Sequence, residues 1–202
     1  MCNNNSTDAT AEVAEREGAR VVFEPINQIG RARDAGACGA TGDWLIFVDA
    51  DSHPSIELFR EVAGAIRSGR YLAGGCTVVL DEPLPLPVRA LVSTWNALSR
   101  SAKWMAGSFI FCEAAAYREI GGFSKELYAS EELDLSQRLK KLAKRKKKKV
   151  VILHRHPLVT SGRKFHLYSR GEHVRFWLRA ILGFGRCLKD PKQCFTWYDG
   201  RR

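Results

Sequence analysis

The sequence predicts an α/β fold: an open mixed sheet, mostly parallel, that is flanked by helices and followed by a C-terminal helical extension. Two patterns lead to this expectation. Short apolar runs alternate with longer segments whose apolar residues recur at helical spacing, as in strands joined by crossover helices. The run 44–48 is apolar at every position, which is typical of strands buried on both faces of a parallel sheet. With 202 residues, 45% of them hydrophobic, the chain can bury one sizeable core.

Turn and cap residues delimit the elements of the N-terminal half. Gly18 is expected to end the first helix, because glycine readily adopts the conformation that closes a helix. A turn at 41–43 precedes the apolar run, and Ser55 stands at an expected helix N-cap. These signals predict helices over 8–17, 29–40 and 55–68, and strands over 20–23, 44–48 and 72–80.

The second half continues the alternation after a proline-rich loop. Three prolines between positions 83 and 87 mark this loop, which leads into an amphipathic segment containing Trp95 and Trp104. The remaining signals predict strands over 108–112 and 150–153, and helices over 113–120 and 131–144. Crossovers between parallel strands are expected to be right-handed.

We expect one domain over 1–160 and an extension over 161–202, where the composition changes. Residues 166–188 are rich in Arg, aromatic and aliphatic side chains, and the apolar ones recur at near-helical spacing. Two interpretations fit. The segment is an amphipathic helix that covers the core, or a helix that lies on an anionic membrane surface.

The formal net charge of +10, from 32 Lys and Arg against 22 Asp and Glu, favours anionic partners such as nucleotide diphosphates, phospholipid head groups or nucleic acid. Much of the excess lies in the run 144–149. This run is either a solvated helix end or a patch for membrane or nucleic acid. No DNA- or RNA-binding motif accompanies it, so nucleic acid is not an expected partner.

Cysteine usage and hydropathy favour a cytoplasmic protein, soluble or peripheral on the inner face of the membrane. The six cysteines include no C-x-x-C pair, so neither a zinc site nor a disulfide framework is predicted. The first residues are polar, unlike a signal peptide. No apolar stretch approaches the ~20 residues that span a bilayer.

Two aspartates follow the apolar run directly, in the sequence Asp49-Ala50-Asp51. Open α/β sheets bind ligands at the carboxyl ends of their strands. Two carboxylates at this place can hold a hard divalent cation, which would neutralise a diphosphate. The alternative is that these acids only end the strand and cap the helix that follows Pro54.

The segments 3–10, 30–36 and 41–51 resemble, in order and spacing, motifs of the family-2 glycosyltransferases, which have the Rossmann-like GT-A fold. The resemblance implies a binding site for a nucleotide-sugar donor. Its expected residues are Asn3, Asn5 and Asp8 for the base and ribose, Arg33 beside the phosphates, and Asp49, Ala50 and Asp51 for the metal and diphosphate.

Downstream, 107–123 resembles the acceptor-side strand and G-G-F turn of this family, and 131–139 is similar to its E-D-x-D-L-x-x-R-L motif. That motif supplies the catalytic base. The resemblance places the base at Glu132, with Glu131 and Asp134 as alternates. Arg138 either orients a phosphate or carboxylate, or forms an i, i+4 ion pair with Asp134.

The activity implied by the resemblance is transfer of a sugar from a nucleotide diphosphate, UDP in the first place, to an acceptor hydroxyl with inversion. A carboxylate takes the hydroxyl proton. A divalent cation, Mn²⁺ or Mg²⁺, stabilises the departing diphosphate. The segment from Trp95 to Trp104 is expected to line the acceptor side, and a homodimer is a further expectation.

Two residues beyond the predicted strand 150–153 extend the expected site. His156 is a candidate metal ligand, because some relatives place a metal or phosphate ligand here. Arg163 lies in 160–164, which offers hydroxyls, a glycine and two cations. Such a loop can close over a diphosphate.

The chain departs from the family pattern at its start. The family's first strand and its P-x-x-N-E loop have no counterpart, so we expect an N-terminally truncated domain with an open sheet edge. Asn3 and Glu132 stand where the family usually has Asp. The alternative functions are a catalytically inactive module that binds nucleotide or membrane, and a nucleic-acid-binding protein.

Overall fold

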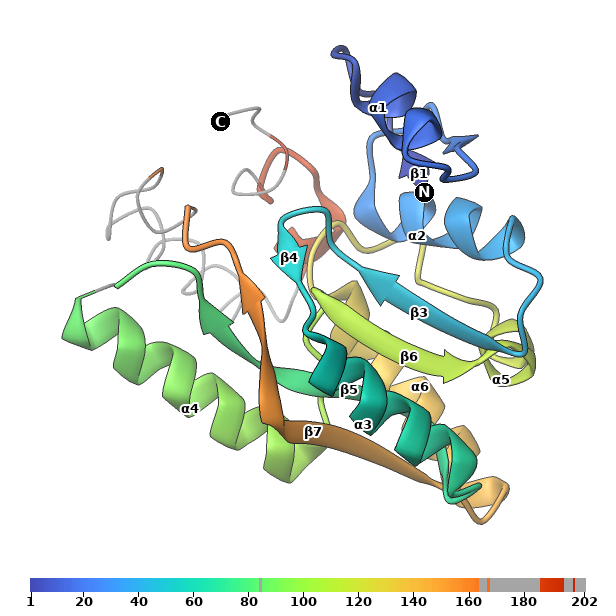
Figure 1. The fold of residues 1–202 in the computed structure, drawn as a ribbon, viewed down its shortest axis with the longest axis vertical. Helices are drawn as coiled ribbons and strands as arrows, with labels where there is room; N and C mark the ends of the chain where they lie inside the picture. Colours follow the sequence, from blue (N-terminus) through green and yellow to red (C-terminus); the bar gives the residue numbers. More distant parts are fainter. Residues whose placement is uncertain (84, 164–166, 168–185, 195–197, 199–202) are drawn as a thin grey trace. The chain divides into compact units, whose positions relative to one another are not determined.

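The computed structural model describes residues 1–83, 85–163, 167, 186–194 and 198 (Figure 1). The chain divides into two compact units. Unit 1 comprises Met1–Gly42, Phe123–Glu131 and the described part of Tyr168–Arg202, and unit 2 comprises Asp43–Gly122 and the described part of Glu132–Leu167. The expected division at 160/161 stays a prediction. Most of the expected helix over 166–188 lies outside the described residues.

The described part of unit 1 includes a small parallel sheet, the helices α1 (Thr10–Arg16) and α2 (Ile29–Cys38), and the 3₁₀ helix η1 (Arg186–Lys189). Strand β1 (Cys2–Asn3) pairs with β2 (Val22–Phe23). Helix α1 buries no residue, and α2 buries Gly30 and Ala37. The predicted order of α1, β2 and α2 is confirmed, with shorter bounds than the sequence predicts, whereas β1 was not predicted.

Side-chain hydrogen bonds of Gln28 and Asp34 connect helix α2 to the segment 123–131. The side chain of Gln28, which is fully buried, donates to the carbonyls of Lys125 and Leu127 at 3.0 and 2.8 Å. The Asp34 carboxylate accepts from the Phe123 N–H at 3.0 Å. These bonds tie together parts of unit 1 that lie about ninety residues apart in the chain.

Unit 2 is built on a five-stranded sheet in the order β3-β6-β5-β7-β4. Its strands are β3 (Trp44–Val48), β4 (Ser52–His53), β5 (Tyr71–Leu80), β6 (Phe109–Glu113) and β7 (Lys149–Thr160). Within this sheet only β5 and β7 pair in parallel. A mixed sheet is therefore confirmed, whereas the prediction of mostly parallel pairing is wrong, because periodicity along one strand does not encode the direction of its neighbour.

Among the residues that the structure describes, the helices beside this sheet are α3 (Ile56–Arg67), α4 (Leu86–Ala102), α5 (Ala114–Glu119) and α6 (Glu131–Arg145), and Glu131 belongs to unit 1. The Ser55 hydroxyl accepts from the Leu58 N–H at 3.1 Å, which confirms the expected N-cap of α3. Leu58 and Val62 then pack against Phe109, Phe111 and other buried residues of the core. Figure 1 shows α3 lying along one face of the sheet.

Strand β3 lies at an edge of the described sheet and pairs with β6 alone. Ile46 and Val48, which share one face of the strand, are 40% and 41% exposed. The expectation that both faces of this strand are buried is therefore wrong at Ile46 and Val48. The expected effect of a missing first strand stays a prediction.

Strand β7 is three times longer than predicted and contains a large bulge. Leu153 is opposite Cys76, and Leu158 is opposite Val78, so the four residues 154–157 face Thr77 alone. Pro157 within this stretch has no N–H to donate to a neighbouring strand. A proline argues against a strand in the sequence, so the second half of β7 was not predicted. The Thr77 hydroxyl beside the bulge is buried and has no hydrogen-bond partner among the described residues.

Asn96 of α4 binds the backbone of β5 beyond the last residue paired with β6. Its side chain donates to the Val78 carbonyl at 2.8 Å and accepts from the Val78 N–H at 3.0 Å, whereas β6 pairs only with Ala73–Gly75. The amide of Asn96 thus takes the place of a neighbouring strand at this residue.

The lysine-rich run is partly engaged within unit 2. Arg145 and Lys146 form ion pairs with Glu119, and Lys148 binds Glu113. These pairs favour the interpretation of the run as a solvated helix end. Among the described residues no helix combines the length and apolar character needed to cross a bilayer.

Candidate functional site

The Asp49–Asp51 turn lies where three strands of unit 2 end. The Ser52 N–H donates to the Asp49 carbonyl at 3.1 Å, which closes the turn, and the Ser161 N–H donates to the Asp51 carbonyl at 3.1 Å. The hydroxyls of Ser52 and Thr160 are 2.9 Å apart. The end of β7 is therefore fixed beside the two aspartates.

Asp81, directly after β5, fastens the loop that carries Arg163. Its carboxylate accepts from the Gly162 N–H at 2.9 Å, and its own N–H donates to the Thr160 carbonyl at 3.1 Å. The structure thus brings Asp49, Asp51 and the Arg163 backbone to one edge of the sheet. Sequence reasoning missed Asp81, because its role depends on the meeting of β5 and β7.

The short segment 105–108 connects this turn to the start of α6. The Asp49 N–H donates to the Ser108 carbonyl at 3.1 Å. The Met105 N–H donates to the Ser136 hydroxyl at 3.0 Å, and that hydroxyl donates to the Glu132 carbonyl at 2.7 Å. Since three residue steps span about 10 Å at most, the aspartate turn and the first turn of α6 within unit 2 are close neighbours.

Two of the three candidate acids on α6 are bound to arginines. Glu131, which is 4% exposed, forms an ion pair with Arg33 at 2.7 Å in unit 1. Asp134 accepts from Nε and Nη2 of Arg138 at 2.8 and 2.6 Å. Glu132 is half-buried, and its carbonyl is fixed by Ser136.

Arg138 has the i, i+4 ion pair that the sequence offered as one of its two roles. Its third nitrogen donates to the Ile120 carbonyl at 2.8 Å, which ties α6 to the end of α5. The side chains of Arg138 and Asp134 are 28% and 36% exposed, so the pair itself contributes little to stability.

Arg33 is held by more than its ion pair. Its guanidinium lies 5.3 Å from the centroid of the Phe123 ring, an arrangement that a cation and an aromatic face favour. With Glu131 at 2.7 Å, the planar guanidinium has a fixed orientation in unit 1. Phosphate binding by Arg33 stays a prediction.

The N-terminal polar residues of unit 1 form a compact turn. Asn3 accepts from the Ser6 N–H at 2.9 Å, Asn5 has a left-handed backbone with φ of 61°, and Asp8 accepts from the Thr10 N–H at 3.1 Å beside the start of α1. Asn5 and Asp8 are exposed, whereas Asn3 is half-buried. Their expected contacts with base and ribose stay a prediction.

Asn4 has a role that the sequence did not suggest. Its side chain donates to the carbonyls of Glu24 and Ile26 at 2.9 and 2.7 Å and accepts from the Gln28 N–H at 3.1 Å. One amide therefore shapes the loop between β2 and α2. Only the fold reveals this role, because the contacts join residues that are 20 to 24 positions apart in the chain.

The structure does not group His156 with Asp49 and Asp51 in a metal-binding cluster. Its Nδ1 lies 2.5 Å from Oε1 of Glu61 on α3. Within the described part of the chain no group of three or more His, Cys, Asp or Glu side chains is placed to hold a metal ion. The role of His156 as a metal ligand stays a prediction, and its observed partner is Glu61.

The donor set at Asp49 and Asp51 suits a hard cation. Carboxylate oxygens are the ligands that Mg²⁺ and Mn²⁺ accept, and a cation held by one or two carboxylates completes its shell with water and phosphate oxygens. The residues present therefore fit a divalent cation that is shared with a diphosphate.

Trp95 and Trp104, the two tryptophans of the segment expected on the acceptor side, are both half-buried. Trp95 packs against the core cluster that contains Val78 and Phe109. The Trp104 carbonyl accepts from the Ser99 hydroxyl at 2.6 Å. The role of this segment on the acceptor side stays a prediction.

A model of the protein family described as glycosyl transferase family 2 matches residues 1–119. Proteins from Mycobacterium tuberculosis and Mycobacterium bovis, both named as uncharacterized glycosyltransferases, are 51% identical to the chain over 103 residues. That match covers 50% of the chain and 47% of each relative. The chain thus spans about half the length of these curated relatives.

Solved structures share the fold at low sequence identity. A mannosyltransferase from Pyrobaculum calidifontis, in complex with GDP-Man and Mn²⁺, has a TM-score of 0.62 at 17% identity, over 89% of the chain and 50% of that protein. Glucosyl-3-phosphoglycerate synthase from M. tuberculosis, in complex with Mn²⁺ and UDP-glucose, has a TM-score of 0.59 at 16% identity, over 90% and 66%. S. aureus TarS 1–349 in complex with UDP has a TM-score of 0.61 at 14% identity, over 96% and 57%.

Proposed function

The chain belongs to glycosyl transferase family 2, and on that premise we propose that it transfers a sugar from a nucleotide-diphosphate donor to an acceptor hydroxyl, with inversion and with a divalent cation at Asp49 and Asp51. The observation that carries the proposal is the backbone network that joins the aspartate turn to the Arg163 loop and, through 105–108, to Glu132. The neighbours that bind UDP- or GDP-sugars with Mn²⁺ support a nucleotide-sugar donor.

The proposed cation supplies charge stabilisation to the departing diphosphate. Asp49 and Asp51 hold it, and Arg163 contributes a positive charge from the loop beside them. Asn3, Asn5 and Asp8 recognise the nucleoside in this proposal, and a UDP-sugar is the donor that the family resemblance favours.

Glu132 is the proposed general base. It occupies the family's position for this group and is held near the aspartate turn by Ser136. Glu131 and Asp134 serve as positioning residues, because each carboxylate binds an arginine. A base in this role contributes roughly 10²- to 10⁴-fold to the rate.

Calorimetric titration with UDP tests the cation site. We expect UDP to bind in the presence of Mn²⁺, and binding to fall by about tenfold or more in Asp51→Ala, which removes a charged ligand. Asp43→Ala is the matched control, since Asp43 is an exposed aspartate at the opposite end of β3. Metal-independent binding that Asp51→Ala leaves unchanged contradicts the proposed site.

Hydrolysis of UDP-glucose tests the base, since water can replace an unidentified acceptor. We expect Glu132→Gln to lower the rate by roughly 100-fold or more while UDP binding is retained, and Glu119→Gln to change neither. Metal-dependent UDP binding by the native chain, without any donor hydrolysis, favours the alternative of an inactive nucleotide-binding module.

Peripheral attachment to an anionic membrane and a cytoplasmic location remain part of the proposal, supported by the net charge of +10. We also propose that the protein forms a homodimer. Sedimentation of the purified chain measures it directly, and a single monomeric species excludes it.

A further inference from the structure

A groove of about 660 Å³ lies in unit 2 between the C-terminal end of α4, the middle of β7 and α3. Arg100, Lys103, His154 and Arg155 line it, together with Glu61. None of these residues belongs to the site assigned above. Figure 1 shows the end of α4 beside the bend in β7.

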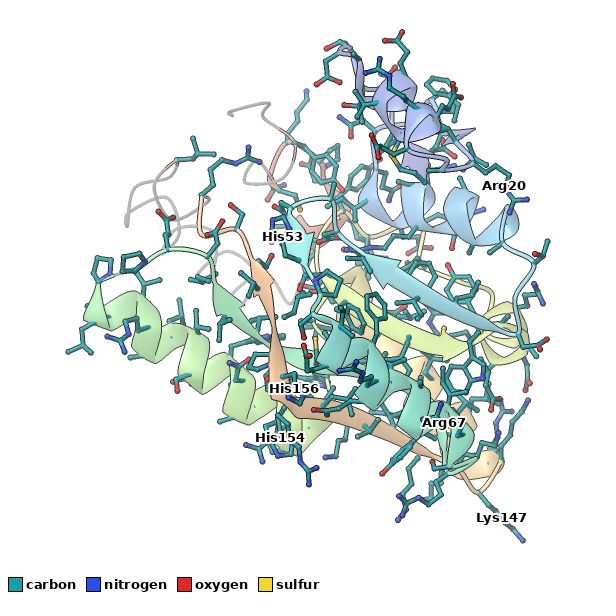
Figure 2. All side chains as sticks on the ribbon, viewed as in Figure 1. Arg20, His53, Arg67, Lys147, His154 and His156 are labelled. Carbon is teal, nitrogen blue, oxygen red and sulfur yellow. The ribbon has the colours of Figure 1, made fainter. Side chains whose placement is uncertain are left out.

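The bulge in β7 sets the direction of two of these side chains. Its four residues, 154–157, face the single residue Thr77 of β5, so the strand leaves its regular pleat where it borders the groove. A bulge redirects side chains in this way. His154 and Arg155 are exposed at the groove, while His156 binds Glu61 (Figure 2).

The charges in the groove are unbalanced. Arg100, Lys103 and Arg155 are cationic, and among the described residues none of them forms an ion pair with an acid. The one acid, Glu61, already binds His156 at 2.5 Å. Like charges in a partly enclosed space repel one another unless an anion joins them.

A role limited to the helix dipole explains only part of this cluster. Cations near a helix C-terminus are favourable, which accounts for Arg100 in the last turn of α4. The helix dipole does not explain the presence of Arg155, because this residue belongs to β7 and not to α4. In addition, Lys140 already donates to the Ala102 carbonyl at the end of α4 at 2.5 Å.

We propose that this groove binds the phosphate group of an anionic ligand, at a site separate from the aspartate turn. The guanidinium groups of Arg100 and Arg155 suit bidentate binding to phosphate oxygens. Lys103 adds a point charge and His154 a ring N–H. Both soluble organic phosphates and phospholipid head groups carry the required group.

Calorimetric titration with inorganic pyrophosphate tests the site in buffer that contains a chelator, so that no divalent cation holds pyrophosphate at Asp49 and Asp51. We expect the native chain to bind, and Arg100→Gln/Lys103→Gln to bind about tenfold or more weakly, because charge-assisted hydrogen bonds are lost. Lys144→Gln/Lys147→Gln removes the same charge from exposed positions elsewhere in unit 2 and is expected to bind like the native chain. Equal weakening in the two double variants, or loss of binding in Asp51→Ala, overturns the proposal.

Nuclear magnetic resonance gives a second readout that does not depend on the variants. Pyrophosphate is expected to shift the imidazole resonances of His154 in the native chain and to leave those of the exposed His53 on β4 in place (Figure 2). Binding that leaves the His154 resonances unmoved places the anion outside the groove and overturns the proposal.

Vesicles distinguish the two sources of phosphate. If the ligand is a lipid, the native chain binds phosphatidylcholine vesicles only when they contain phosphatidylglycerol, and Arg100→Gln/Lys103→Gln weakens this binding more than Lys144→Gln/Lys147→Gln does. If the ligand is soluble, pyrophosphate binding depends on the groove and vesicle binding does not.

Discussion

At the scale of single residues, the pair of Arg33 and Glu131 is the most enclosed ion pair among the described residues of unit 1. Its side chains are 10% and 5% exposed, so neither charge is compensated by water when its partner is removed. Removal of one partner from such a pair is strongly destabilising. The pair therefore gives Glu131 a structural importance that its place in the acidic motif did not suggest.

We expect Glu131→Ala to lower the free energy of unfolding by about 3 kcal/mol, because the enclosed Arg33 loses its ion pair with Glu131. Urea unfolding measures the loss. Glu119→Ala is the control, since Glu119 binds Lys146 and Arg145 at the surface and its removal should cost within about 0.5 kcal/mol. Equal losses in the two variants contradict the assignment.

The cysteines should differ sharply in reactivity. Burial raises the pKa of the Cys76 and Cys112 thiols to about 12, so neither forms the reactive thiolate near pH 8. Cys38 is exposed. Iodoacetamide at pH 8 should therefore modify Cys38 in the folded chain, whereas Cys76 and Cys112 should react only after unfolding, as measured by peptide mass spectrometry.

The residues of the site were predictable where a short motif carries them. Asp49 and Asp51 follow an apolar run and were found by their position. Asp81 and Ser136 could not be found, since each acts by binding backbone from a distant segment. A single sequence without its fold contains no local signal for such contacts.

At the scale of elements, the sequence predicted most helices and strands of both units, because burial imposes their periodicities on the apolar residues. It missed β1 and β4, which have two residues each, and the bulged half of β7, where polar residues and Pro157 interrupt the pattern. It also misjudged β3, since an apolar run reports hydrophobicity and does not reveal whether a neighbour covers it.

Two glycines of unit 2 should respond in opposite ways to alanine. A Cβ at Gly74 would lie 2.7 Å from the Val151 carbonyl and would overlap the buried Phe111 ring, so Gly74→Ala should destabilise by about 2 kcal/mol. Gly64 lies inside α3 with no atom near its Cβ position, and Gly64→Ala should stabilise by roughly 0.5–1 kcal/mol. Thermal unfolding of both variants compares them, and a stable Gly74→Ala contradicts the close packing of β5.

At the scale of the whole molecule, the two units interleave along the chain. Unit 1 combines residues from the start, the middle and the end. Its C-terminal segment contacts the rest of unit 1 at three places. The Tyr128 N–H donates to the Leu188 carbonyl at 2.7 Å, and Cys194 packs with Ala129. The Ile29 N–H donates to the Tyr198 hydroxyl at 3.2 Å. Local sequence patterns could not predict this assembly.

Removal of residues 186–202 should therefore loosen unit 1 selectively. We expect faster hydrogen exchange in 123–131 and at the start of α2, and unchanged exchange in β5 and β6, which belong to unit 2. Lys189→Gln is the control, because its pair with Glu126 is exposed and contributes roughly 1 kcal/mol at most. Uniform acceleration in both units contradicts their independence.

The amide of Asn96 has a consequence for how the protein behaves when crowded. A strand whose backbone N–H and carbonyl groups are unpaired can pair with a strand of another molecule, and such pairing leads to aggregation. Because the Asn96 side chain binds both the N–H and the carbonyl of Val78, a strand of another molecule cannot form backbone hydrogen bonds at this residue. A polar residue inside an amphipathic helix thus helps to keep the folded chain in solution.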